Sequence, residues 1–153
     1  VLRLMLSRSD NLCTNALIAR VGMERLNRVF QDGLGLKSTQ LQRKMMDLDA
    51  RAAGRENWIG AADAIRLYDR IRELAPEERA WLEPMLLANQ DTSLLLRDVP
   101  RDSLEFYHKT GSLPGVLNDW CDTRERELFL LTNRGEDEGM VNRVFGEIGK
   151  MLV

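Results

Sequence analysis

Residues 104–132, LEFYHKTGSLPGVLNDWCDTRERELFLLT, decide the fold of this protein. Apolar and polar side chains alternate over residues 104–109, which is the pattern of a half-buried strand. Residues 111–115 contain two glycines and a proline and predict a turn, and residues 116–121 and 128–132 predict two further strands. Because short connections join antiparallel neighbours, we expect a three-stranded antiparallel sheet.

The residues before this sheet are predicted to be mostly helical. A helix begins near residue 11, where Ser9 or Asp10 can serve as its N-cap and Gly22 as its C-cap. Pro76 suits the first turn of a later helix. The chain closes with an amphipathic helix that begins at about Glu138. The other predicted helices cover residues 23–30, 61–74 and 92–97.

A helical region followed by a sheet and one helix makes an α+β chain. We expect a helical region over residues 1–103, and the sheet strands with the C-terminal helix over residues 104–153. Residues 36–60 are irregular apart from a short helical piece within residues 41–53. Loops of this length in compact domains are usually functional or disordered, and this composition is not that of a disordered segment. The sequence therefore predicts a functional loop.

Composition excludes several classes of protein. The 153 residues suit one domain, and a net charge of −2 without a basic cluster argues against a nucleic-acid surface. No apolar run approaches the ~18 residues of a transmembrane helix. Cys13 and Cys121 make no disulfide framework, and with His108 as the one histidine a zinc site is not expected. Both cysteines are expected to be buried. Since the chain starts at Val1, we expect a segment upstream.

Two tripeptides carry chemistry. Residues 9–11 read Ser-Asp-Asn at the start of a helix, and residues 109–111 read Lys-Thr-Gly at the end of a strand. Either alone has an ordinary structural explanation, as a helix cap or as the end of an edge strand. Together, in this order and about 100 residues apart, they match two parts of the signature of class A β-lactamases and penicillin-binding proteins.

The surrounding sequence resembles the same family along essentially the whole chain. Residues 9–15 (SDNLCTN), 33–63 and 108–119 (HKTGSLPGVLND) resemble its helix start, its active-site loop and its strand-turn-strand. The resemblance implies a β-lactamase/transpeptidase-like fold, with an incomplete sheet in this chain. It also implies a serine hydrolase that opens β-lactam rings through an acyl-serine intermediate and so gives resistance to these antibiotics.

The resemblance assigns roles to residues of both tripeptides. Ser9 would relay a proton to the leaving nitrogen of the opened ring, and Lys109 would be the cation that attracts the substrate carboxylate. The remaining four are substrate-binding residues. Thr110 would hydrogen-bond the same carboxylate, Asn11 would hold the acylamino side chain, and the N–H of Ser112, beyond Gly111 on an open strand edge, would donate to the oxyanion.

The chain departs from the family at the nucleophile. None of its serines is followed three residues later by a lysine, so the Ser-x-x-Lys segment lies outside this chain. A second chain or an upstream segment is expected to carry it, and this chain alone is expected to be inactive. A non-catalytic fragment that binds peptidoglycan or a protein partner is therefore an alternative function.

A second departure concerns the loop. Met45 stands two residues after Arg43, where β-lactamases place a deacylating glutamate. Asp47 is a candidate substitute base, although an aspartate here can equally cap a helix. Arg43 and Asn57 are expected to tie the two ends of the loop together. With slow deacylation, the alternative is a D,D-peptidase or a slowly deacylating penicillin-binding protein.

Three further positions have mainly structural expectations. Asn15 matches a position that usually orients the loop. His108 points away from Lys109 and is expected to be a packed core histidine. Leu117 replaces an arginine that many β-lactamases use for the substrate carboxylate, and Arg143 on the last helix is a candidate replacement.

The resemblance also sets the expected partners. The substrate is a β-lactam or a peptidoglycan-like small molecule, and no cofactor or metal is required because Ser and Lys perform this chemistry. Since such substrates lie outside the cytoplasmic membrane, the resemblance implies a secreted or periplasmic protein.

Overall fold

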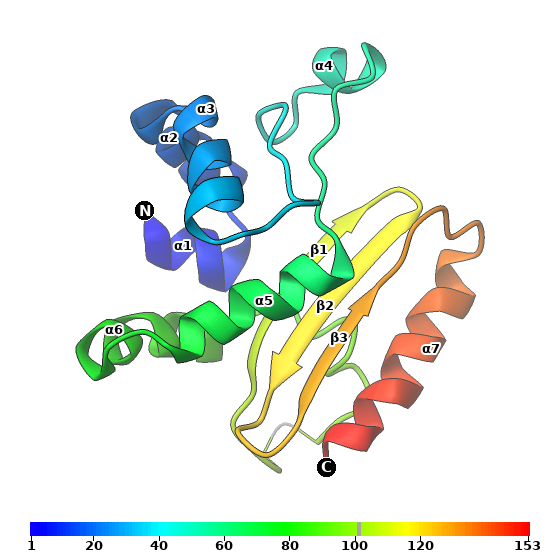
Figure 1. Cartoon of the computed structure of the whole chain (residues 1–153). Coiled ribbons are helices and arrows are strands. Elements are labelled where there is room, and N and C mark those ends of the chain that lie inside the picture. Colours follow the sequence, from blue (N-terminus) through cyan, green and yellow to red (C-terminus); the bar gives the residue numbers. More distant parts are fainter. Residues whose placement is uncertain (101) are drawn as a thin grey trace. The chain divides into compact units, whose positions relative to one another are not determined.

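The computed structural model describes residues 1–100 and 102–153. They divide into two compact units, and Figure 1 labels the elements of both. The first unit comprises Val1–Met5 and Asp10–Arg79, and the second comprises Leu6–Ser9 and Ala80–Val153. The division between residues 103 and 104 stays a prediction. Within the described residues, no helix combines the length and the apolar character that crossing a membrane requires.

The helices of the first unit begin and end at residues suited to these places. Asp10 is the N-cap of α2, and its carboxylate accepts the N–H of Cys13 at 2.8 Å. Gly22, with φ 90°, ends α2 and donates its N–H to the Ile18 carbonyl. Of the two candidates for the N-cap, Asp10 and Ser9, Asp10 is therefore the one that caps α2. The elements are α1 (Leu2–Arg8), which ends in the second unit, α2 (Asn11–Val21), α3 (Met23–Arg28) with a π-helical turn (Val29–Gly33), α4 (Leu48–Ala52) and α5 (Ala61–Arg72).

The second unit is built around the predicted antiparallel sheet. Its strands follow the order β1-β2-β3, with short connections between them. The register places Lys109 opposite Trp120 and Thr110 opposite Asp119. The α+β class and the three antiparallel strands are confirmed. The elements are α6 (Pro76–Leu87), which begins in the first unit, β1 (Tyr107–Leu113), β2 (Val116–Asp122), β3 (Glu127–Leu131), α7 (Glu138–Gly149) and a 3-10 turn (Lys150–Leu152).

The helix predicted over residues 92–97 is wrong, because this segment forms turns. Its amides have partners other than the carbonyls of a helix. The Ser93 N–H donates to the Asp91 carboxylate at 3.1 Å, and the Leu95 N–H donates to the Asp119 carboxylate at 3.1 Å. These side chains offer the backbone an alternative to helical hydrogen bonds.

The first strand also differs from its prediction. β1 begins at Tyr107 rather than near residue 104, and it continues to Leu113, through residues 111–113 where a turn was expected. The turn is confined to Pro114 and Gly115, and Gly115 takes the left-handed φ of 76° that a tight hairpin requires. Lys109 therefore lies inside the strand rather than at its end. The helix α1 was not predicted.

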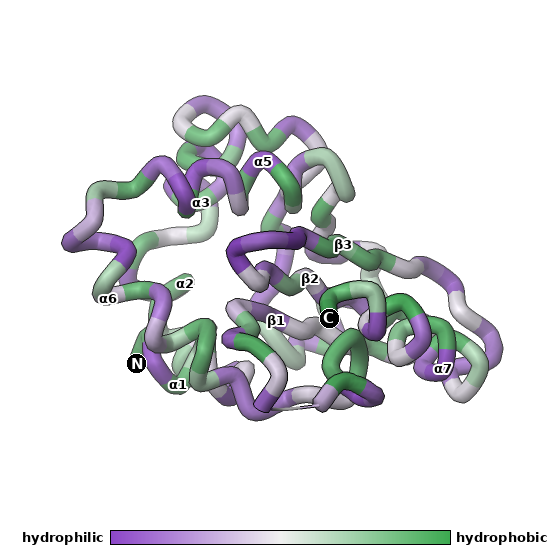
Figure 2. Tube along the Cα trace, turned by 90° about the horizontal axis from the view of Figure 1, so that it is seen from below, coloured by the Kyte–Doolittle hydropathy of each residue, from purple (hydrophilic) through white to green (hydrophobic). Residues whose placement is uncertain are grey.

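The core of the second unit lies between the sheet and α7. Phe145 from α7, Cys121 from β2 and Leu95 from the preceding turns are each 0% exposed, and Leu117 and Phe106 are 8% exposed. Burying a side chain of this size stabilises the fold by roughly 1.5–3 kcal/mol. Figure 2 shows α7 with hydrophobic and hydrophilic segments alternating, as an amphipathic helix requires. Burial raises the pKa of the Cys121 thiol to about 12.

Candidate active site

The tripeptides' serine and lysine meet in the second unit. The Lys109 ammonium donates a hydrogen bond to the Ser9 hydroxyl and a second one to its neighbour's carbonyl, Thr110 O, at 2.5 Å. Ser9 has φ 52°, a left-handed conformation that is uncommon for residues other than glycine. This conformation turns the chain sharply after α1 and places the Ser9 hydroxyl within hydrogen-bond distance of the Lys109 ammonium.

Lys109 is a cation held partly out of water. Burial lowers its pKa below the usual 10.5, and the carboxylates of Asp91 and Asp119 oppose that shift. The ammonium has three N–H donors, and two of them are used by Ser9 and Thr110. Within the part of the chain that the structure describes, these are the hydrogen bonds of the ammonium, so its third donor can serve an anion bound at the site.

The residues after Lys109 form an accessible strand segment. Thr110 is buried, whereas Gly111 and Ser112 are exposed. A Cβ atom at Gly111 would meet no atom within 4 Å, so the space beside it is open. Among the described strands, β1 lies at one end of the sheet order, which leaves its outer edge free for a bound molecule.

A cavity of about 710 Å³ adjoins this strand segment. Ser112 and Leu117 contribute to its wall, and Arg97 contributes a cation. Arg143, the arginine considered from the sequence, is exposed and is absent from the cavity wall. The sequence had no signal for Arg97, because the turn that carries it was predicted to be a helix. The lining residues are Ser93, Leu94, Arg97, Ser112, Leu113, Pro114, Leu117, Glu138 and Asn142.

A buried polar pair lies beside Lys109. The side chains of His108 and Asp119 are 2% and 1% exposed, and His108 Nδ1 is 3.7 Å from Asp119 Oδ1. That distance is an electrostatic contact but is too long for a hydrogen bond, and among the described residues neither atom has a hydrogen-bond partner. Burial raises the pKa of Asp119 above its usual value, even though His108 favours its ionised form. The prediction that His108 is buried is confirmed.

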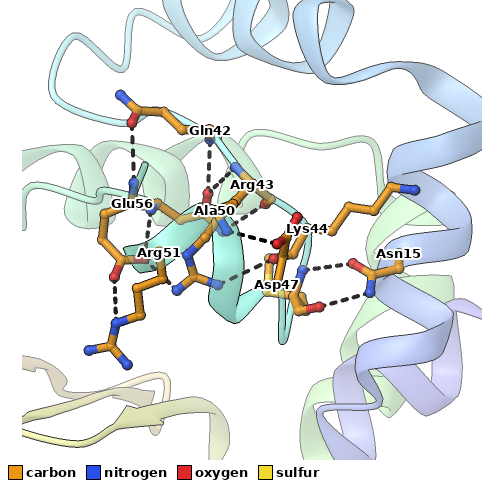
Figure 3. A network of polar contacts seen from close by, with 10 residues as sticks. Asn15, Gln42, Arg43, Lys44, Asp47, Ala50, Arg51 and Glu56 are labelled. Atoms are coloured by element: carbon orange, nitrogen blue, oxygen red, sulfur yellow. Dashed lines mark hydrogen bonds and ion pairs between the residues drawn. The ribbon is translucent and has the colours of Figure 1, made fainter. Parts of the chain in front are cut away.

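Asn11 is the first residue of α2, in the first unit, and it is exposed. Asn15, one turn later, holds the predicted loop. Its amide donates to the Met45 carbonyl at 3.0 Å, and its oxygen accepts the Met45 N–H at 2.8 Å (Figure 3). Both backbone groups of Met45 are thereby fixed to α2, which is the orienting role expected for Asn15.

The two ends of the loop are joined by an ion pair that the sequence did not reveal. Arg43, only 4% exposed, donates Nε and Nη2 to the Glu56 carboxylate (Figure 3). Asn57 Oδ1 accepts the N–H groups of Gln42 and Arg43, at 2.8 and 3.0 Å. Burial alone would raise the pKa of Glu56, but the Asn57 N–H and Arg43 lower it below its usual value. Asn57 thus binds backbone groups of the loop, while its neighbour Glu56 is the carboxylate that pairs with Arg43.

Asp47 is the N-cap of α4. Its Oδ1 accepts the Ala50 N–H at 2.9 Å, so one carboxylate oxygen has a structural partner (Figure 3). Cys13 differs from its prediction in degree, because it is half-buried, whereas Cys121 is fully buried as expected. Within the part of the chain that the structure describes, no group of three or more His, Cys, Asp or Glu side chains could hold a metal ion.

The sequence pattern of the beta-lactamase enzyme family matches residues 1–153. The chain belongs to this family. Its second unit carries the Ser9–Lys109 contact, and its first unit carries a loop closed by Arg43 and Glu56. Among curated proteins, no relative matches this sequence.

Solved structures share the fold. A beta-lactamase from Sphaerobacter thermophilus is 29% identical with a TM-score of 0.75, and 93% of this chain covers 56% of that one. A variant of the last common ancestor of Gram-negative class A beta-lactamases is 25% identical, with a TM-score of 0.74 and coverages of 97% and 60%. PBP-A has the same fold at 23% identity, with a TM-score of 0.78 and coverages of 97% and 57%. The chain therefore spans less than two thirds of these relatives.

Proposed function

We propose that this chain is part of a serine hydrolase that opens β-lactam rings through an acyl-serine intermediate. The observation that carries the proposal is the hydrogen bond between Lys109 and Ser9, which lies next to the exposed strand segment of Gly111 and Ser112. Membership of the beta-lactamase enzyme family supports the same chemistry. The attacking serine would lie outside this chain, in an upstream segment or a second chain.

The proposed acylation uses residues of this chain for three tasks. The attacking serine gives its hydroxyl proton to a base outside this chain as its oxygen bonds to the lactam carbonyl, the C–N bond of the ring breaks, and the ring nitrogen receives a proton by way of Ser9, which regains one from that base. Ser9 delivers that proton. Its hydroxyl accepts a hydrogen bond from the Lys109 ammonium, and this positive charge stabilises the deprotonated form of Ser9. The N–H of Ser112 donates to the developing oxyanion. Lys109 and Thr110 bind the substrate carboxylate.

Asn11 would hold the acylamino side chain of the substrate through its exposed carboxamide. Hydrolysis of the acyl-enzyme would need a base in the loop of the first unit. Met45 offers none, and Asp47 already caps α4 with one oxygen. The proposal therefore includes slow deacylation, with Asp47 as the candidate base. Substrates of this class place the protein outside the cytoplasmic membrane, as a secreted or periplasmic enzyme that protects its cell from β-lactams.

Slow deacylation also favours a second candidate function, a D,D-peptidase or a slowly deacylating penicillin-binding protein. Two specific observations favour it: Met45 stands at the position of the usual deacylating glutamate, and Asp47 caps α4 with one of its carboxylate oxygens. Accumulation of ring-opened product well beyond one equivalent would favour the β-lactamase, whereas a long-lived adduct and one equivalent of product would favour the penicillin-binding protein.

Intact-mass spectrometry before and after exposure to benzylpenicillin tests the proposal. We expect one polypeptide of the purified protein to gain the mass of one benzylpenicillin, and the Lys109→Ala variant to gain it much more slowly. Arg143→Ala is the matched control, because it removes an exposed cation. A purified protein that includes a Ser-x-x-Lys segment yet forms no adduct and releases no ring-opened product would refute the proposal. The remaining candidate function would then be a non-catalytic module that binds peptidoglycan or a protein partner.

A further inference from the structure

Asn89 holds the peptide group that leads into Lys109. Its side-chain amide donates a hydrogen bond to the His108 carbonyl at 3.1 Å. Since Asn89 lies outside the sheet and β2 pairs with the other side of β1, this bond is made at the outer edge of the strand. A peptide bond is planar, so the His108 carbonyl and the Lys109 N–H belong to one rigid group. Asn89 thereby fixes the backbone orientation from which the Lys109 side chain starts.

Asn89 is itself held at three points. Its backbone N–H donates to the Leu86 carbonyl at the end of α6, at 3.1 Å, and its side-chain oxygen accepts the Asp91 N–H at 3.1 Å. The third point is the bond to His108. Asn89 is only 8% exposed, so these hydrogen bonds lie largely out of water. A buried polar network in which every member has a partner is rigid, and Asn89 therefore gives β1 a fixed anchor.

The next residue along the chain anchors the segment that carries Ser9. The Gln90 N–H donates to the Ser7 carbonyl at 2.9 Å. Ser7 is 5% exposed, and its carbonyl belongs to the last turn of α1, where carbonyl groups have no partner within the helix. Two consecutive residues, Asn89 and Gln90, thus bind the backbone one residue before Lys109 and two residues before Ser9.

We propose that Asn89 is a positioning residue that, together with the backbone N–H of Gln90, holds Lys109 against Ser9. Ordering a long lysine side chain costs conformational entropy, so its hydrogen bond to Ser9 is favourable only where both backbones are already in place. A displacement of about 1 Å in such a site can slow a reaction roughly a hundredfold. This inference rests on the proposed function, because it names the residue that maintains the geometry for proton delivery by Ser9.

The first test measures acylation by benzylpenicillin in the protein that carries this chain. Asn89→Ser keeps an oxygen that can accept the Asp91 N–H, but its side chain is too short to reach the His108 carbonyl. We expect acylation to slow by about tenfold or more. Asn27→Ala is the matched control, because the Asn27 side chain likewise binds backbone, the N–H and carbonyl of Leu41, each at 2.8 Å. It should be acylated at the native rate. Thermal unfolding checks that both variants are folded.

The second test is NMR of protein labelled with ¹³C at the lysine Cε atoms, with the Lys109 signal assigned from Lys109→Ala. Asn89→Ser should shift or broaden this signal, whereas the signal of Lys150, which pairs with Glu147, should stay unchanged. Asn27→Ala should change neither signal. Native-like acylation of Asn89→Ser, or an unchanged Lys109 signal in that variant, would overturn the inference while acylation of the native protein leaves the proposed function standing. If the native protein with its Ser-x-x-Lys segment is not acylated, the proposed function fails and the inference fails with it.

Discussion

The Lys109 ammonium donates a hydrogen bond to the Ser9 hydroxyl, and 100 positions of sequence separate the two residues. The serine lies between two helices and the lysine lies within β1. Burial around the lysine lowers its pKa, so holding it protonated in the folded state costs free energy. Such a cost is expected at sites built to bind an anion.

Lys109→Met should reveal this cost as a pH dependence. Between the lowered pKa of folded Lys109 and 10.5, the unfolded chain binds more protons than the folded one. The unfolding free energy of the native protein should therefore rise relative to the variant as pH increases from about 7 to about 10. Urea unfolding at several pH values measures it.

Lys150→Met is the control for this effect. Glu147 raises the pKa of Lys150, so its contribution is complete below 10.5 and is lost only as pH rises through the higher folded pKa. The difference between native protein and this variant should stay flat over the same pH range. A flat difference for Lys109→Met as well would contradict the lowered pKa.

Glu56→Gln should destabilise the loop-bearing unit by roughly 2–4 kcal/mol, because it leaves the buried Arg43 guanidinium without its carboxylate. Since the pKa of Glu56 is lowered, its contribution is present above 4.5 and is lost as pH falls through the folded pKa. Denaturant unfolding of native protein and variant at neutral and acid pH measures both effects.

Glu73→Gln provides the comparison, because it breaks an ion pair in which Arg70 and Glu73 are 50% and 61% exposed. That change should cost less than about 0.5 kcal/mol. If the Glu56→Gln and Glu73→Gln variants had the same unfolding free energy, the ion pair of Arg43 and Glu56 would not stabilise the loop.

Asn15→Ala should free the Met45 backbone. Its N–H loses the acceptor at 2.8 Å, and its carbonyl loses the donor at 3.0 Å. Hydrogen exchange of the Met45 amide should accelerate by about tenfold or more, since local opening no longer breaks these bonds. The Leu41 amide, which donates to Asn27 at 2.8 Å, serves as the internal control and should be unchanged. Equal acceleration at both amides would indicate general unfolding instead.

Gly149→Ala should be among the most damaging single substitutions. A Cβ atom at this position of α7 would overlap the Leu95 carbonyl, which is backbone and cannot rotate away. We expect a loss of about 3 kcal/mol or more in unfolding free energy. Gly33→Ala is the matched change, because its nearest side-chain atom lies 3.9 Å away. It should be neutral or stabilising by up to about 1 kcal/mol. Thermal unfolding of both variants decides the matter.

Much of the architecture followed from local chemistry. The alternation before residue 110 and the Pro114-Gly115 turn predicted antiparallel strands, and Gly22 and Asp10 predicted the ends of α2. The failure at residues 92–97 has a clear cause. The Asp119 carboxylate that takes the Leu95 N–H lies on a strand 24 positions away, so no pattern within the segment could reveal it.

The loop shows the same division. Arg43 was expected to tie the loop, but the partner chosen from the sequence, Asn57, binds backbone groups, and the acid is its neighbour Glu56. Neighbouring residues on an extended chain point in opposite directions, and only the folded path decides which one faces the guanidinium. Arg97 in the cavity wall was likewise missed because its turn depends on tertiary contacts.

The amino-acid sequence alone was enough to predict the α+β class, the antiparallel sheet and the ends of α2, and it contains the two tripeptides that indicate the family. These depend on side-chain periodicity, turn residues and short-range hydrogen bonds, which are all properties of neighbouring residues. The folded chain was needed to show that Ser9 contacts Lys109 and that Glu56 pairs with Arg43. The first contact joins residues far apart in the sequence, and the second involves one of two neighbouring residues, Glu56 rather than Asn57. The strength of both depends on burial, which arises only when the chain is packed.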